Sequence, residues 1–331
     1  MRVMYDELYG VMRDRLLERG VREEIASGCA RNLAETSLSG VYSHGLNRFP
    51  RIIAMMEKGL IKPENRPLCV SAAGAFEVWD GLLGMGNTNA AFCMDRAVSM
   101  AKASGAGVVA LRNTNHWQRG GAFGIQAAKA GCAAVCWTTT MPNMPVWGGA
   151  DRRIGNNPLV FSVPYGDDWV LFDGAMAQFS YGAIESAQLA GKPLPVAGGY
   201  DERGQLTTDP DAIARTWRVL PIGFWKGSGF SLLMDMMASV LSGGKPVCEI
   251  GKQGNTPEAE YGLNQMFIAI NATEDRSAVI DLMIADIKDS VRAEGVFEIR
   301  YPGEREKRVR GENLELGIPV NEEIWNAVKA L

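Results

Sequence analysis

Histidine is the side chain best suited to acid–base chemistry near neutral pH, and this chain of 331 residues contains only two, His44 and His116. His44 lies in the segment VYSHGLNRFPR, next to a glycine that allows another group to approach closely. Arg48 follows four residues later, so the two side chains share a face if the segment is helical. A histidine that moves a proton and an arginine that clamps a carboxylate are what chemistry on a 2-oxo or 2-hydroxy acid requires. The same pattern also fits a capping histidine beside a surface arginine.

His116 lies in a polar loop, LRNTNHWQRGGAFG, which begins with the last residues of the apolar segment VVALR. Loops at the ends of strands often carry functional groups. Gly120 and Gly121 precede a helical pattern, where backbone N–H groups can bind an anion. His116 is therefore a second candidate for acid–base chemistry, and a hydrogen-bonded structural histidine is the alternative.

Nucleotide-binding signatures are incomplete in this sequence. The segment GLLGMGNTN contains Gly84 and Gly86, but Asn89 stands where a dinucleotide-binding turn has its third glycine. The acidic residue expected at the end of the next strand is also missing, because VVALRN ends in a basic and an amide residue. GFWKGSG places Lys226 among glycines without the spacing of a P-loop. No serine-hydrolase elbow, zinc-protease motif or kinase motif is present, so neither these enzymes nor a Rossmann fold are expected.

Hydrophobic periodicity predicts two kinds of structure around these groups. Residues 1–60 are expected to form three helices, at 1–20, at 21–38 and from about Asn47 to residue 60, because Pro50 is tolerated only in a first helical turn. Residues 61–70 resemble a linker. From residue 73 on, strands alternate with helices, which is typical of a mixed α/β domain.

In this second part, strands are expected at 75–81, 108–113, 133–140, 158–165, 169–176, 265–272 and 296–304. Helices are expected at 89–105, 120–131, 229–243, 276–294 and 321–331. The segment 229–243 has almost no polar face, and we expect it to be buried. Residues 197–212 are polar and rich in glycine, and we expect a long surface loop.

The composition argues against several classes of partner. Lysine and arginine number 34 against 38 acidic residues, a net charge of −4, which does not suit nucleic acid or an anionic membrane surface. No apolar run approaches the ~20 residues that span a bilayer. The amphipathic N-terminus does not resemble a signal peptide, so we expect a cytoplasmic protein. Six cysteines are too few for a disulfide scaffold. Cys132 and Cys136 lack a second ligand pair, which predicts buried thiols and no metal site.

At SGVYSHGLNRFPR, LRNTNHWQRGG, FSYG and GFWKGSG the sequence resembles the malate/L-lactate/ureidoglycolate dehydrogenase family, and the likeness extends over almost the whole chain. The family uses a nicotinamide cofactor without a Rossmann fold. The resemblance implies an α/β (α+β) fold, with a mainly helical domain from both chain ends beside a mixed-sheet cofactor domain. We place the helical domain at residues 1–72, 230–262 and 306–331, and the NAD(P)-binding domain at 73–229 and 263–305. A homodimer is also implied, with cofactor and substrate between the domains.

The resemblance assigns roles to residues at matching positions. His44 matches the family's catalytic histidine, the proton donor in reduction, and Arg48 matches a contact to the substrate carboxylate. His116 matches a second active-site histidine, which some members use as the acid–base group. The expected cofactor is NAD (NADH) or NADP (NADPH). Its expected contacts are Trp169, Val170, Leu171, Phe172, Asp173, Gly174, Ala175, Trp225, Lys226, Gly303, Glu304 and Arg305.

Departures from the family pattern bear on the substrate and the cofactor. FSYG at 179–182 replaces the A-x-G-K form of malate and lactate members and favours a sugar acid, so reduction of 2,3-diketo-L-gulonate to 3-keto-L-gulonate is the expected reaction. Thr139 stands in place of an asparagine, and Arg305 stands where this branch more often has histidine, which leaves NADH and NADPH open. If His44 donates the proton, a nearby carboxylate should raise its pKa, and Asp173 is the candidate. Without such a partner, His116 would be the better donor.

Other interpretations remain open at this point. The substrate could be another 2-oxo acid, such as oxaloacetate or pyruvate, or a cyclic imino acid. A different class is a cofactor-free isomerase or lyase that uses the two histidines as an acid–base pair. A third is an oligomeric binding protein without catalysis, in which replacing His44 would change nothing measurable.

Overall fold

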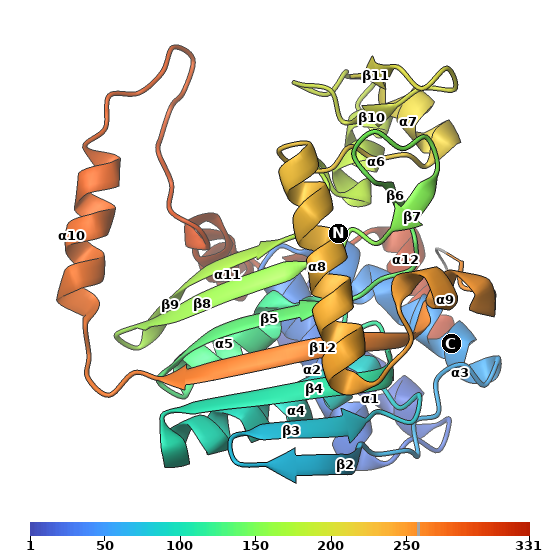
Figure 1. Ribbon diagram of the computed structural model, residues 1–331, viewed down its shortest axis with the longest axis vertical. Helices are drawn as coiled ribbons and strands as arrows, with labels where there is room; N and C mark the ends of the chain where they lie inside the picture. Colours follow the sequence, from blue (N-terminus) through green and yellow to red (C-terminus); the bar gives the residue numbers. More distant parts are fainter. Residues whose placement is uncertain (257–258) are drawn as a thin grey trace.

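The computed structural model describes residues 1–256 and 259–331. A twisted seven-stranded sheet carries helices on both faces, and a helical domain stands beside it (Figure 1). The helices are α1 (Tyr5–Leu17), α2 (Glu23–Leu38), η1 (Tyr42–His44), η2 (Leu46–Arg48), α3 (Phe49–Glu57), α4 (Gly86–Ser104), α5 (Gly121–Lys129), α6 (Tyr181–Leu189), α7 (Pro210–Thr216), α8 (Trp225–Ser242), α9 (Val247–Ile250), η3 (Gly251–Gln253), α10 (Ser277–Lys288), α11 (Glu304–Leu316) and α12 (Glu322–Ala330). The strands are β1 (Arg2–Val3), β2 (Leu68–Ala73), β3 (Phe76–Asp80), β4 (Ala106–Asn115), β5 (Cys132–Thr138), β6 (Met144–Pro145), β7 (Arg152–Ile154), β8 (Leu159–Tyr165), β9 (Asp168–Gly174), β10 (Gly199–Tyr200), β11 (Leu206–Thr207), β12 (Tyr261–Asn271) and β13 (Ile318–Pro319).

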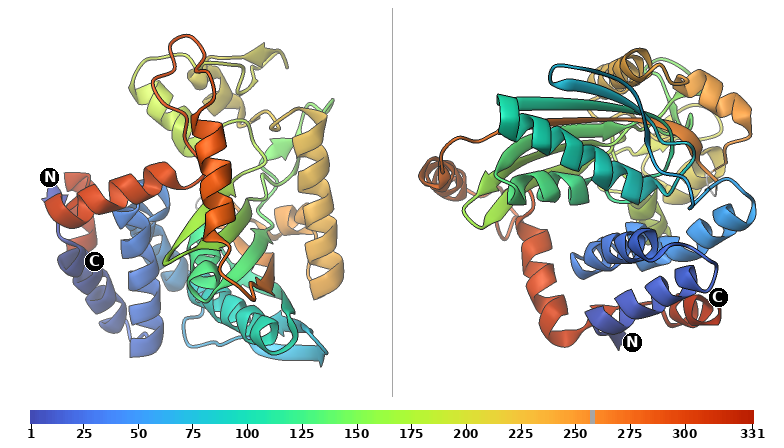
Figure 2. Two further views of the ribbon diagram at one scale, coloured as in Figure 1. Left: turned by 90° about the vertical axis from the view of Figure 1, so that its left-hand side faces the viewer. Right: turned by 90° about the horizontal axis from the view of Figure 1, so that it is seen from below.

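The helical domain combines both ends of the chain. Amphipathic helices α1, α2 and α3 bury Leu8, Leu33 and Phe49 in one core, to which the C-terminal segment adds Ile318 and Trp325. Strand β1 pairs antiparallel with β13, so the first and last segments are hydrogen-bonded to each other. Figure 2 shows the N-terminal and C-terminal helices side by side. The predicted construction of this domain from the two chain ends is therefore confirmed.

The sheet has the order β2-β3-β4-β12-β5-β8-β9. Strands β3 and β4 are parallel, and every other neighbouring pair is antiparallel. Helices α4 and α5 cover one face, and α8 lies on the other. A mixed sheet of this order differs from the parallel sheet of a Rossmann fold, as the sequence predicted. Cys132 and Cys136 are buried thiols in the core under α4 and α5.

Besides the long loop predicted at residues 197–212, which contains β10, β11 and the start of α7, two predicted features of the fold are wrong. Residues 296–303 form no strand, although their apolar residues alternate. The segment contributes a single backbone bond to the sheet, from the Leu171 N–H to the Pro302 carbonyl, and Phe297 is almost fully exposed. Alternation alone does not make a strand, because a strand also needs a partner along its length.

The second error concerns α8, which the sequence predicted to be buried. One face packs on β4, β12 and β5 and buries Met234 and Ala238. The opposite face leaves Phe230 58% and Val240 80% exposed. A helix that is apolar all round can pack in a core or against another protein, and the sequence does not distinguish these two cases. The structure also places this helix on the sheet, and not in the helical domain, where residues 230–262 were expected.

Candidate active site

The two histidines and Arg48 lie close together, although they come from distant parts of the chain. His44 ends η1, and His116 directly follows the C-terminal end of β4, an interior strand of the sheet. The two imidazole rings are stacked, with centroids 6.0 Å apart and planes 28° apart. Arg48 lines a small cavity together with His116. The three residues that the sequence singled out for chemistry therefore share one site.

Tight packing on α2 positions His44. Gly45 follows His44 directly, and a Cβ at this position would lie 2.9 Å from the backbone nitrogen of Ser37 on α2. The Ser43 hydroxyl lies 3.0 Å from Nδ1 of His44. The Nε–H of Arg48 donates to the Ser43 carbonyl over 3.0 Å. This turn therefore fixes the imidazole and the guanidinium relative to each other.

The glycine-rich turn that resembled a nucleotide-binding loop instead holds the loop of His116. A Cβ on Gly86 would overlap the carbonyls of Asn115 and His116, so only glycine allows α4 to begin this close to the end of β4. The Asn115 side chain donates to the carbonyls of Leu83 and Gly84, each over 2.9 Å. These two hydrogen bonds attach the residue before His116 to the glycine-rich turn and so hold the histidine in place.

The environment of His116 determines its tautomer. Its Nδ1 accepts a hydrogen bond of 3.0 Å from the backbone N–H of Gln118, a residue with a φ of 68°. A positive φ is strained for glutamine and is commonly retained where function requires it. Because Nδ1 is an acceptor, neutral His116 carries its proton on Nε2.

Glu260, which sequence reasoning missed, provides the carboxylate beside the histidines. Its Oε2 lies 3.9 Å from Nε2 of His116, and its Oε1 accepts the N–H of Met141 over 2.8 Å. The carboxylate side chain is only 12% exposed and lines the same cavity as Arg48 and Arg51. Nothing in the polar segment around Glu260 resembles a motif, so the sequence carried no signal for this residue.

Burial and nearby cations disfavour a charged imidazole at this site. The pKa of His44 is lowered to about 3, mainly by burial. The positive charges of Arg48, Arg119 and Arg51 contribute to the same shift. Burial also holds the pKa of His116 well below its ordinary value, and the positive charge of Arg48 is the next largest cause. Burial lowers the pKa of Arg48 to about 10, so its guanidinium stays charged at neutral pH. Burial raises the pKa of Glu260, while Arg48 and Arg51 oppose that rise.

Asp173 is not the partner of His44. Its carboxylate accepts the backbone N–H of Gly121 over 2.7 Å, at the first residue of α5. This bond stabilises the helix end, where an acceptor and a negative charge are both favourable. The charges that act on His44 are guanidinium groups, not a carboxylate. The expected rise in the pKa of His44 is therefore absent, and the pKa is lowered instead.

The expected cofactor residues of β9 lie beside Gly303. Gly303 has a φ of 89°, and a Cβ there would lie 3.3 Å from the backbone of Leu171. Glu304 forms an ion pair with Lys288, and Arg305 is exposed. Successive side chains of β9 point to opposite faces of the sheet, so residues 169–175 do not line a single face.

Trp225 and Lys226 begin α8 on the other side of the sheet from α5. The preceding loop joins the end of β9, because the N–H of Ile222 donates to the Met176 carbonyl over 2.9 Å. Trp225 is largely exposed, and Nζ of Lys226 lies 6.0 Å from the centre of its ring. The start of α8 therefore lies near the end of β9, while Gly303 lies beside the middle of β9.

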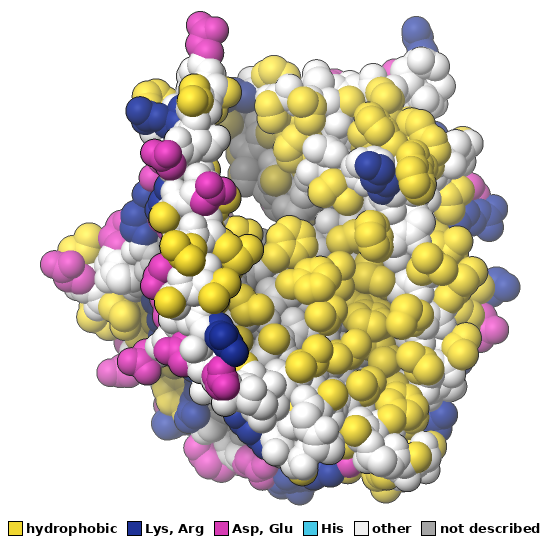
Figure 3. Space-filling model, turned by 60° about the vertical axis from the view of Figure 1, so that its left-hand side comes forward, with side chains coloured by type: hydrophobic (Ala, Val, Ile, Leu, Met, Phe, Trp, Pro, Cys, Tyr) yellow, Lys and Arg dark blue, Asp and Glu magenta, His cyan; other side chains and the backbone are white. Residues whose placement is uncertain are grey.

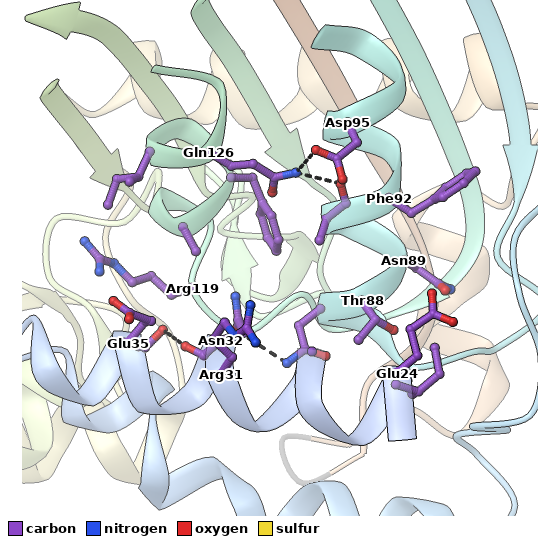
Figure 4. A pocket seen from close by; sticks show the side chains of 18 of the residues that line it. Glu24, Arg31, Asn32, Glu35, Thr88, Asn89, Phe92, Asp95, Arg119 and Gln126 are labelled. Atoms are coloured by element: carbon purple, nitrogen blue, oxygen red, sulfur yellow. Dashed lines mark hydrogen bonds between the residues drawn. The ribbon is translucent and has the colours of Figure 1, made fainter. Parts of the chain in front are cut away.

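A larger cavity, about 940 Å³, separates α2 from α4 and α5 (Figure 4). Its walls include Phe92, Arg119 and Gln126, and three of its lining residues carry buried polar atoms without a hydrogen-bond partner. These atoms are Oδ1 of Asn87, Nε of Arg119 and Nε1 of Trp169. The cavity has the size of a typical small-molecule site. Arg119 lies close enough to the candidate active site for its charge to act on His44.

Within residues 1–256 and 259–331, no group of three or more histidine, cysteine, aspartate or glutamate side chains could hold a metal ion. The same residues contain no helix that is long and apolar enough to cross a membrane.

The model of the malate/L-lactate dehydrogenase family matches residues 3–329, and the chain belongs to this family. It is an oxidoreductase that acts on CH–OH or oxo groups. The 2,3-diketo-L-gulonate reductases of Citrobacter koseri and Salmonella paratyphi A are each 42% identical to it over 336 residues, with all of both chains covered. Solved structures with the same fold include sulfolactate dehydrogenase from Methanocaldococcus jannaschii, with 30% identity, a TM-score of 0.91 and coverage of 100% of this chain and 96% of that one. Another is malate dehydrogenase from Entamoeba histolytica, with 25% identity, a TM-score of 0.93 and the same coverage.

Proposed function

We propose that this protein uses NADH or NADPH to reduce a small 2-oxo acid, and that the substrate is 2,3-diketo-L-gulonate, reduced to 3-keto-L-gulonate. The observation that carries the proposal is the stacked pair His44 and His116 beside Arg48 in one buried site. The 42% identity to 2,3-diketo-L-gulonate reductases over the full chain supports the particular substrate.

In this proposal, Arg48 binds the C1 carboxylate of the substrate, because a guanidinium presents two parallel N–H donors to a carboxylate. The C2 carbonyl oxygen then lies toward the imidazoles of His44 and His116. Reduction adds a hydride to C2 and a proton to the oxygen, and a bound nicotinamide cofactor supplies the hydride. An imidazole supplies the proton and stabilises the negative charge that develops on the oxygen.

We assign the proton transfer to His116, with His44 as a second contact to the substrate oxygen. His116 has a carboxylate, Glu260, 3.9 Å away, whereas the charges that act on His44 are those of arginines. Both imidazoles are neutral in the free site at pH 7. A substrate carboxylate on Arg48 offsets the cation that lowers both pKa values, so substrate binding favours protonation of the imidazole.

The cofactor would be held by residues 169–175 of β9, by Trp225 and Lys226, and by residues 303–305. Two features of the structure support this assignment. The buried indole N–H of Trp169 has no partner and can donate to a ligand. Gly303 packs so closely on the backbone of Leu171 that a side chain would crowd it, so segments 303–305 and 169–175 lie next to each other.

We also propose that a second copy of the chain covers the exposed apolar face. Figure 3 shows a broad hydrophobic surface on the side of the molecule that carries α8 and α10. Exposed members are Phe161 on β8, Phe172 on β9, Phe230, Leu233 and Val240 on α8, and Leu282 on α10. Soluble monomers rarely expose contiguous apolar surface on this scale, so a homodimer is the expected state.

A panel of 2-oxo acids, assayed with NADH and with NADPH, tests the proposed function. We expect cofactor oxidation with 2,3-diketo-L-gulonate, and a 10²- to 10⁴-fold lower kcat in the His116→Ala variant. His44→Ala is the matched variant, and a smaller loss of kcat is expected for it. Absence of oxidation with every 2-oxo acid, together with no NADH binding by tryptophan fluorescence, would favour the cofactor-free isomerase instead.

A further inference from the structure

We propose that Glu260 restricts the substrate to 2-oxo acids with a single carboxylate and hydroxyl groups near C2, and excludes dicarboxylates. This inference rests on the proposed function, because it concerns the substrate of the same site. Glu260 would distinguish 2-oxo acids with one carboxylate from those with a second acidic group. Membership of a common fold does not make this distinction.

The charge pattern of the cavity limits where a second acidic group of the substrate can bind. Its described lining residues include the cations Arg48 and Arg51 and one carboxylate, Glu260. In the proposed binding mode, the C1 carboxylate of the substrate binds Arg48. The charge of Arg51, the other cation, already acts on Glu260. A second substrate carboxylate would therefore lie in a buried space beside a negative charge, where repulsion is much stronger than in water.

The side chain of Glu260 cannot easily turn away from the cavity. The backbone N–H of Met141 holds Oε1 over 2.8 Å, and the side chain is almost fully enclosed. Its other oxygen, Oε2, lies 3.9 Å from Nε2 of His116. That distance is too long for a hydrogen bond, so Oε2 can still accept one from a ligand.

The substrate would lie between Arg48, His116 and Glu260. If the C2 oxygen is hydrogen-bonded to Nε2 of His116 and the C1 carboxylate to Arg48, the substituent on C3 comes within a few ångströms of Oε2. A hydroxyl on C3 or C4, or the hydrate of a C3 carbonyl, can donate a hydrogen bond to this carboxylate. A carboxylate at the same position has no proton to donate, and its charge repels Glu260. Glu260 therefore attracts one class of substrate and repels the other.

The test compares oxaloacetate with 2,3-diketo-L-gulonate as substrates of the wild-type protein and of Glu260→Gln. Glutamine retains the shape and an acceptor oxygen but removes the charge. We expect the ratio of kcat/KM for oxaloacetate to that for 2,3-diketo-L-gulonate to rise at least tenfold in Glu260→Gln. The control is Glu202→Gln, which removes the same charge from an exposed ion pair with Arg215 and should leave the ratio unchanged.

A ratio in Glu260→Gln within threefold of the wild type overturns the inference while leaving the proposed function intact. Absence of any 2-oxo acid reduction by the wild type would defeat the proposed function itself. Competitive inhibition of the wild type gives a second measurement that does not depend on a variant that folds. L-Threonate, a hydroxylated monocarboxylate, should inhibit at a concentration at least tenfold lower than L-malate, and equal or stronger inhibition by L-malate would overturn the inference.

Discussion

Acid should destabilise this protein through His44, which the fold keeps neutral. In the unfolded chain an imidazole has a pKa of about 6.5, and in the folded protein the pKa of His44 is about 3. Between these values the unfolded chain binds more protons than the folded one, so stability is lost as the pH falls below about 6.5. From pH 7 to pH 5 the linkage amounts to about 2 kcal/mol for one such histidine, and this is an upper value because His44 is partly exposed.

Two measurements check this prediction. Urea unfolding at pH 7 and at pH 5 should show a smaller loss of stability in His44→Gln than in the wild type, by up to about 2 kcal/mol. Because the chain has only two histidines, NMR can follow each imidazole separately. Neither signal should titrate between pH 8 and pH 5, and a bound carboxylate inhibitor should raise the pKa of both by offsetting Arg48.

The result that would refute this reasoning is a His44 signal that titrates near pH 6.5 in the free protein. It would mean that water reaches the imidazole and that the three guanidinium groups do not act on it. A wild type and a His44→Gln variant with the same stability loss at pH 5 would contradict the linkage directly.

Two further predictions concern the carboxylate clamp and the apolar face. Arg48→Lys should raise KM for the 2-oxo acid at least tenfold with a smaller effect on kcat, because a point charge replaces a two-donor fork. Steady-state kinetics decide this, and an unchanged KM would remove Arg48 from substrate binding. Leu233→Glu should convert the proposed dimer to a monomer in sedimentation analysis, since it buries a charge in the proposed interface. Lys58→Glu, a charge change outside that face, is the control, and a dimer in both variants would place the interface elsewhere.

The sequence predicted most of the long helices and strands, because hydrophobic periodicity is a local property, but it missed α6, α7, α9 and α11. It placed α2 and β8 within two residues of their observed ends. It failed at residues 296–303, where alternating apolar residues found no pairing strand. It also failed at α8, because the surface that covers an apolar helix is not encoded in the helix itself.

For the site, the sequence alone determined which groups are available for chemistry. The scarcity of histidine and the motifs around His44, Arg48 and His116 identified them without coordinates. Only the tertiary structure decided that the two imidazoles stack, that Glu260 lies beside His116, and that Asp173 instead caps α5. The physical reason is that these contacts join residues far apart in the chain. The packing of the helical domain on the sheet sets their distances and pKa values, and no local pattern of residues records that packing.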